Sequence, residues 1–190
     1  MPTMKLKDLI PEGILPAAED DAIAFLRAEH DRVEDLFASF DEIKYGRADA
    51  DKQRIVGDIC RELRLHSTVE EELFYPAVRA EIADDDLMNE AMVEHDGIER
   101  LVADLEVMQP EDDMVNAKMH VLDAYVTHHV REEEENIFPK ARESGIDLAA
   151  LAGKMARRRA KLLQAGAAKP VTASGKTRAR GAPGEPRAHR

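Results

Sequence analysis

The chain has one cysteine, no tryptophan and only 4% aromatic residues. Cys60 alone cannot form an internal disulfide, and the lack of a cysteine pair argues against structural zinc and iron–sulfur sites. No stretch approaches the roughly 18 apolar residues of a membrane-spanning helix, and the first residues do not read as a positively charged segment followed by an apolar run. These absences predict a soluble protein of a reducing compartment, and we expect a cytoplasmic protein with no membrane partner.

Charge is divided unevenly along the chain. The formal net charge is −12, but residues 154–190 hold eleven Lys or Arg and one acidic residue, Glu185, so residues 1–153 carry a net charge of −22. An acidic body repels phosphate backbones, so only the basic tail could contact nucleic acid or another acidic partner. The tail has no aromatic residue to stack on bases. We therefore favour a solvated extension over a nucleic-acid-binding arm.

Glycine and proline are scarce between residues 19 and 143, where apolar residues recur at spacings of three and four. This pattern predicts helices rather than strands. We expect four long helices and a shorter basic one, over about residues 20–44, 50–79, 86–108, 112–142 and 146–164. Short links favour an all-α fold, an up-down-up-down four-helix bundle over residues 19–145. Residues 1–18 are expected to form an irregular arm and residues 165–190, which are rich in Gly, Ala, Pro, Lys and Arg, a disordered tail.

Two motifs each occur twice. Residues 66–76 and 129–139 both read H-x-x-x-E-E-E-x-[FI]-[YF]-P, and residues 29–36 and 94–101 both read E-H-D-x-[VI]-E-x-L. A His and a Glu four residues apart lie about 40° apart on one helical face, so each copy of the first motif can offer an imidazole and a carboxylate to one point. The proline that ends each of these copies should kink or end its helix.

Four histidines fall in the apolar stripes of four different predicted helices, and two glutamates join them. These residues are His30, His66, His95, His129, Glu70 and Glu133. His30 and His66 are 36 residues apart, and His95 and His129 are 34 residues apart. Antiparallel neighbouring helices therefore bring the two histidines of each pair to about the same level along the bundle. A lone histidine on an apolar face is more often a hydrogen-bonded core residue than a ligand. Two buried carboxylates in one bundle centre, however, are costly unless cations neutralise them, and the sequence therefore predicts a dinuclear metal site.

Imidazole and carboxylate donors without thiolate suit iron, manganese, zinc or copper. Ferritin-like di-iron bundles hold paired irons with inward-facing Glu and His in a similar architecture. Six protein ligands for two ions, with two bridging carboxylates, would leave coordination positions open for small molecules.

The doubled motifs resemble those of the hemerythrin HHE cation-binding proteins over about residues 20–143. The resemblance implies two non-haem iron ions, oxo- or hydroxo-bridged, with the four histidines as terminal ligands and Glu70 and Glu133 as bridges. It further implies binding, sensing or detoxification of dioxygen, peroxide or nitric oxide, and a role in stress response. The resemblance implies one difference from the oxygen-carrying hemerythrins, which have a five-histidine arrangement with H-x-x-x-H on the third helix. In this chain Glu99 lies four residues after His95. The missing imidazole favours turnover or sensing over oxygen carriage.

Four further residues could extend the site. Glu34 and Glu99 each follow a predicted ligand histidine by four residues. We interpret them as charged residues beside the apolar stripe of the helix rather than as additional ligands. Glu62 and Tyr125 lie one turn before a predicted ligand histidine and could orient its imidazole by a hydrogen bond. The remaining glutamates of the doubled motif are expected on a solvated face; they are Glu71, Glu72, Glu134 and Glu135.

Two classes of function fit these observations. The first is a di-iron protein that binds, senses or detoxifies dioxygen, peroxide or nitric oxide, with peroxide- or nitric-oxide-consuming activity as its enzymatic form. The second is a non-catalytic iron-responsive binding protein, in which metal occupancy stabilises the bundle and controls a partner contact. Rapid peroxide consumption would indicate the first class, and metal-dependent partner binding the second.

Overall fold

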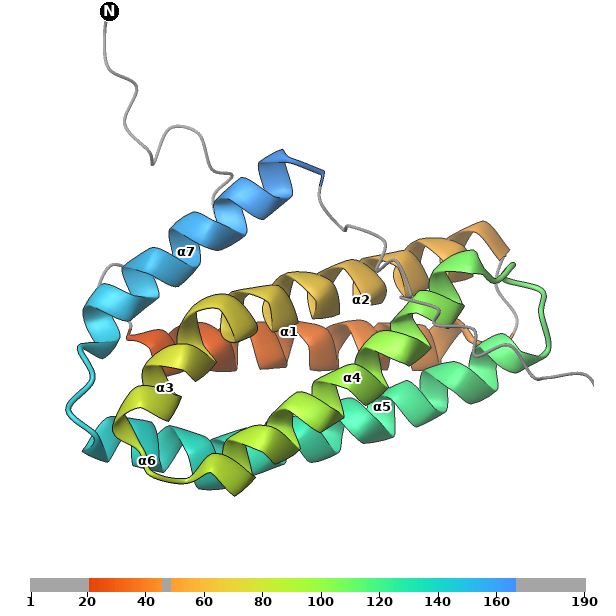
Figure 1. Ribbon diagram of the computed structural model, residues 1–190. Coiled ribbons are helices and arrows are strands. Elements are labelled where there is room, and N and C mark those ends of the chain that lie inside the picture. Colours follow the sequence, from red (N-terminus) through yellow and green to blue (C-terminus); the bar gives the residue numbers. More distant parts are fainter. Residues whose placement is uncertain (1–20, 46–48, 167–190) are drawn as a thin grey trace, which may run out of the picture.

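The computed structural model describes residues 21–45 and 49–166, and every regular element within these ranges is helical. Four long helices run up-down-up-down, as Figure 1 shows; they are α1 (Ala22–Ile43), α2 (Asp49–Val69), α4 (Asp85–Val107) and α5 (Met114–Glu132). The all-α bundle predicted from the sequence is confirmed. The predicted arm at residues 1–18, the first link at residues 46–48 and the tail from residue 167 lie outside the described residues.

Aspartate side chains begin three of the helices. Asp21, Asp84 and Asp147 each accept a hydrogen bond from backbone N–H groups in the first turn that follows. These N–H groups have no partner within the helix, and such a cap contributes about 1 kcal/mol. The local sequence therefore fixes where α1, α4 and the last helix start.

The second and fourth predicted helices each contain a π-helical turn. These turns are η2 (Glu70–Phe74) and η3 (Glu133–Ile137), and they lead into α3 (Tyr75–Glu81) and α6 (Phe138–Glu143). The N–H of Tyr75 donates to the carbonyl of Glu70, and the N–H of Phe138 donates to the carbonyl of Glu133, five residues back in both cases. Each motif proline then falls in the first turn of the next α-helix, where its missing N–H costs little. The chain changes direction between α2 and α3 without leaving the helix (Figure 1).

Buried apolar side chains form two clusters along the bundle. On α1, for example, Leu26 belongs to one cluster and Val33 to the other, and His30 lies between them. On α4, Ala91 belongs to the first cluster and Ile98 to the second, and His95 lies between them. A layer of buried polar groups therefore crosses the bundle between two apolar ends.

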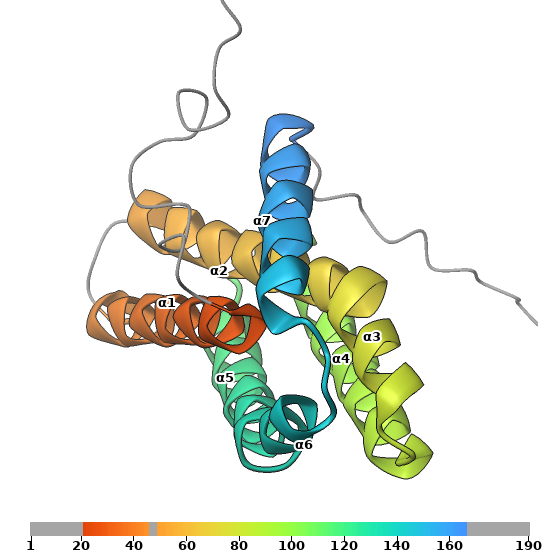
Figure 2. The ribbon, with the colours of Figure 1, turned by 90° about the vertical axis from the view of Figure 1, so that its left-hand side faces the viewer.

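The fifth helix, α7 (Leu148–Gln164), packs on α1, α2 and η2. Figure 2, viewed from the end of the bundle, shows α7 lying across the α1–α2 side. Its apolar face contributes Leu151, Ala152, Met155 and Leu162 to the first apolar cluster. Among the helices of the described ranges, none is long and apolar enough to span a bilayer.

Candidate metal centre

The structure brings all six predicted ligand side chains together in the polar layer. One group is His30, His66, Glu70 and Glu133, and the other is Glu70, His95 and His129; within each group the candidate ligand atoms lie within 4.8 Å of one another. Both glutamates are fully buried, and the histidines are nearly so. Glu70 belongs to both groups.

Nε2 of His95 and Nε2 of His129 lie 2.9 Å apart, within hydrogen-bond distance, but other inner atoms of these side chains have no hydrogen-bond partner within residues 21–45 and 49–166. They include Nε2 of His30 and of His66, both carboxylate oxygens of Glu70, and Oε2 of Glu133. His66 Nε2 lies 3.0 Å from Glu70 Oε2, yet the two do not have the geometry of a hydrogen bond. Buried lone pairs directed at one region are costly unless a cation or a proton lies among them. The donor set therefore fits a pair of metal ions.

The outer nitrogen of each histidine contacts a glutamate of a neighbouring helix. Nδ1 of His66 lies 3.1 Å from Glu29, that of His95 2.9 Å from Glu71, that of His129 2.8 Å from Glu94, and that of His30 3.0 Å from Glu134. The glutamates lie on α1, η2, α4 and η3, and the histidines that they contact lie on α2, α4, α5 and α1, respectively. We call these four glutamates the carboxylate ring. A carboxylate on Nδ1 orients the imidazole, leaves Nε2 free to face the centre and makes it a stronger donor.

The sequence analysis missed the carboxylate ring. Glu71 and Glu134 were expected on a solvated face; their side chains are 40% and 31% exposed, but each also contacts a histidine. The sequence did carry a signal, because every ring glutamate is the immediate neighbour of a predicted ligand. It directly precedes the histidine in the E-H pairs at 29–30 and 94–95, and directly follows the glutamate in the E-E pairs at 70–71 and 133–134.

A tyrosine that the sequence analysis did not single out lies in the second group. The hydroxyl of Tyr75 donates to Oε1 of Glu133 at 2.8 Å and lies 3.1 Å from Nε2 of His95 and 3.5 Å from Nε2 of His129. Burial and the nearby carboxylate of Glu133 raise the pKa of Tyr75 well above its usual value in the absence of metal. The equivalent residue of the other half is Phe138, whose ring stacks on that of His30 with centroids 5.8 Å apart. The hydroxyl thus adds a fourth donor to the group that has only three His or Glu residues.

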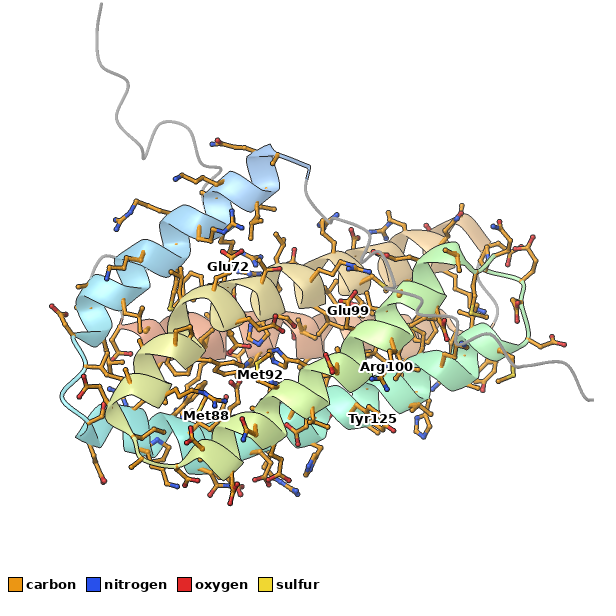
Figure 3. The ribbon with its side chains drawn as sticks, viewed as in Figure 1. Glu72, Met88, Met92, Glu99, Arg100 and Tyr125 are labelled. Carbon is orange, nitrogen blue, oxygen red and sulfur yellow. The ribbon has the colours of Figure 1, made fainter. Side chains whose placement is uncertain are left out.

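Two glutamates that we considered as additional ligands lie outside both groups. Glu99 Oε1 is 2.6 Å from Nη1 of Arg64, in a cluster between α2 and α4 that also contains Glu106 (Figure 3). Glu34 is exposed on α1. Both positions agree with the interpretation of these residues as charges beside the apolar stripe rather than as ligands.

The two candidates for orienting imidazoles do not touch the histidines. Glu62 is buried and accepts a hydrogen bond from Arg159 of α7. Tyr125 is 50% exposed at the junction of α4 and α5, where its ring lies next to Gly97 (Figure 3). The prediction for Tyr125 was wrong, because the ring lies beyond the edge of the buried stripe and turns to solvent.

The metal-free centre is held by ion pairs between imidazole and carboxylate. Burial opposes protonation of His95, but contacts with Glu70 and Glu71 outweigh it and raise the pKa of His95 to about 9 from the ordinary 6.5. A raised folded-state pKa means that the imidazolium stabilises the fold fully below pH 6.5, and that this contribution is lost as the pH rises through about 9.

We therefore expect the melting temperature of the metal-free protein to fall between about pH 6.5 and pH 9. Metal ligands are neutral imidazoles, so the metal-loaded protein should lack this fall. Thermal unfolding followed by circular dichroism, with and without metal, measures both. A melting temperature of the metal-free protein that stays constant over this range would contradict the assignment.

Comparisons with known proteins match this arrangement. Residues 21–141 fit the family model described as hemerythrin HHE cation binding domain. The crystal structure of a hemerythrin HHE cation-binding domain-containing protein from Mycobacterium kansasii superposes with a TM-score of 0.65, at 20% identity, over 80% of this chain and 94% of that one, which shows a shared fold. A protein named DNA nickase from Nostoc is 28% identical over 119 residues, which are 63% of this chain but 33% of that protein. The family match spans most of the chain and contains all six candidate ligands, so the chain belongs to the hemerythrin HHE cation-binding domain family.

Proposed function

We propose that the protein holds two iron ions in the polar layer and uses them to bind, sense or detoxify dioxygen, peroxide or nitric oxide. The observation that carries this proposal is the pair of ligand groups that share the fully buried Glu70. Donors that are nitrogen and oxygen, with no thiolate, suit iron in such a bundle.

The geometry suggests how the donors divide between the two ions. His30 and His66 would hold one ion, and His95, His129 and Tyr75 the other. Glu70 lies in both groups, and Oε2 of Glu133 is 3.2 Å from His30 Nε2 and 3.7 Å from His129 Nε2. These distances support bridging roles for both glutamates.

A small cavity of about 10 Å³ adjoins all four histidines. Its remaining walls are formed chiefly by apolar side chains, namely Val33, Leu63, Ile98, Val126 and Val130. A space at the lower limit for one water molecule excludes large substrates. The apolar walls keep bulk water away from whatever binds there.

A pair of bound iron ions supplies reversible one-electron chemistry to such small oxidants. The carboxylate ring holds the imidazoles in place during this chemistry. The Tyr75 hydroxyl lies beside Glu133 and the second pair of histidines, where it would lose its proton on metal binding and hold the second ion as a phenolate. An anionic oxygen ligand on that ion favours turnover or sensing over reversible carriage.

Protein expressed with supplied iron is expected to contain about two irons per chain and to show the visible absorption of bridged ferric ions. Metal analysis and absorption spectroscopy measure this directly. Less than one iron per chain would contradict the proposal.

Single-turnover mixing of the reduced protein with dioxygen, peroxide and nitric oxide then separates carrier, sensor and enzyme. If metal changes the melting temperature and partner binding while all three oxidants are left unconsumed, the non-catalytic iron-responsive protein is the better description.

We do not extend the activity named for the Nostoc relative to this chain. The chain spans about a third of that protein's length. Residues 1–153 carry a net charge of −22, which repels a phosphate backbone.

A further inference from the structure

One arginine of α7 reaches the buried polar layer. Arg159 is 4% exposed, whereas Lys154, Arg157 and Lys161 of the same helix are exposed. Its Nη1 lies 2.8 Å from Oε1 of Glu29, an ion pair without the geometry of a hydrogen bond, and its Nη2 donates to Oε2 of Glu62. A buried guanidinium needs such compensating carboxylates, and removing one partner of a buried pair is costly.

Glu29 is the ring carboxylate that orients His66. Its Oε2 lies 3.1 Å from Nδ1 of His66, while its Oε1 faces Arg159. One oxygen of this buried carboxylate therefore contacts the imidazole, and the other forms an ion pair with the guanidinium. Arg159, Glu29 and His66 form a line of contacts from α7 through α1 to the inner nitrogen of His66.

This line has no equivalent in the other half of the described chain. Glu94 takes the place of Glu29 there, and its second oxygen lies 3.0 Å from Nε2 of His128, whose side chain is 50% exposed. Glu94 itself is 16% exposed, against 5% for Glu29. The imidazole next to Glu94 is thus held by a carboxylate that water can also solvate, whereas the orientation of Glu29 depends on α7.

We propose that Arg159 is a positioning residue for the ion held by His30 and His66, so that its contact with Glu29 controls how tightly this one ion is bound. The proposal rests on the dinuclear centre proposed above. It adds a dependence that residues 21–141, the part that matches the family model, do not contain, because α7 follows them.

The test is the variant Arg159→Lys, which keeps the charge but loses the planar fork that reaches Glu29 and Glu62 together. Wild type and variant are loaded with Co²⁺ as a spectroscopic probe, and the release of each ion into excess chelator is followed by visible absorption. Loss of a contact that orients a ligand typically costs about tenfold in metal affinity or more. We expect about tenfold faster release of one of the two ions and unchanged release of the other.

The matched control is Arg158→Lys. Arg158 directly precedes Arg159 on α7 and donates two hydrogen bonds to Glu72 of η2 (Figure 3). Glu72 does not belong to the carboxylate ring. Both release rates should match wild type in this variant. If Arg158→Lys accelerates release as much as Arg159→Lys, the effect belongs to α7 docking in general and the proposal is overturned.

A second comparison separates positioning from simple support of the fold. Because Arg159 acts through Glu29, Arg159→Lys should add no acceleration in a Glu29→Gln background. The same tenfold effect in that background, or equal acceleration of both ions, would overturn the proposal.

The double variant Arg159→Met with Glu62→Met removes the arginine together with one of the carboxylates that pair with it. We expect faster release of the same ion from this variant. Unchanged release from the folded double variant would also overturn the proposal. Uptake of fewer than two Co²⁺ by wild type would instead overturn the dinuclear centre itself.

Discussion

Glu70→Ala is expected to abolish the binding of both metal ions, with a loss of more than about 100-fold in affinity. Glu70 is the residue common to the two ligand groups, it is fully buried, and neither of its carboxylate oxygens has a hydrogen-bond partner in the described part of the chain. Iron per chain and visible absorption measure the loss. Glu133→Ala should lose most of the dinuclear absorption as well, because Glu133 lies between His30 and His129.

Glu99→Ala is the matched control for these two variants. Glu99 has the same spacing from His95 as Glu70 has from His66, but it pairs with Arg64 and lies outside both ligand groups. Its removal should leave iron content and absorption near wild type. Retention of one iron by Glu70→Ala would show that Glu70 serves a single ion, and equal losses in all three variants would show that Glu99 is also a ligand.

Tyr75→Phe is expected to change the second ion position while leaving the fold intact. The other half already has Phe138 at this position, so the bundle accommodates a phenyl ring there. The variant removes the hydroxyl that lies beside His95 and His129 and leaves Oε1 of Glu133 without its donor. We expect the loss of any phenolate-to-iron absorption and at least about tenfold weaker binding of one ion.

Tyr125→Phe is the control, because that hydroxyl lies on the half-exposed junction of α4 and α5. Resonance Raman spectra of the iron-loaded proteins distinguish a bound phenolate from a free one. If Tyr75→Phe keeps the wild-type absorption and holds both ions as tightly, the Tyr75 hydroxyl serves only as a donor to Glu133.

The fold and the six candidate ligands were accessible from the sequence because both follow α-helical periodicity. The predicted range 86–108 differs by one residue at each end from α4, since the aspartates at its start and the proline after its end mark its limits. The structure brings the four histidines and two glutamates together because each H-x-x-x-E places two side chains on one face. Local spacing was sufficient for these residues.

Tyr75 was not accessible by the same reasoning. It follows Glu70 by five residues, which on an α-helix places the two about 140° apart. The π-helical turn between them closes its hydrogen bond one residue later and brings Tyr75 back to the face of Glu70. The carboxylate ring was missed for a different reason: all of its contacts run between helices, and only tertiary packing shows which histidine each glutamate meets.

The histidines of each ligand group come from one half of the chain, whereas a carboxylate reaches them from the other half. His30 and His66 receive Glu133, and His95 and His129 receive Glu70. One helical hairpin by itself therefore holds only part of each ion's coordination shell, but two copies of a hairpin facing each other across a twofold axis would complete both shells. The doubled motifs give the bundle the form of such a dimer joined into a single polypeptide. One half has Tyr75 where the other has Phe138, so the two proposed ion positions would be chemically distinct.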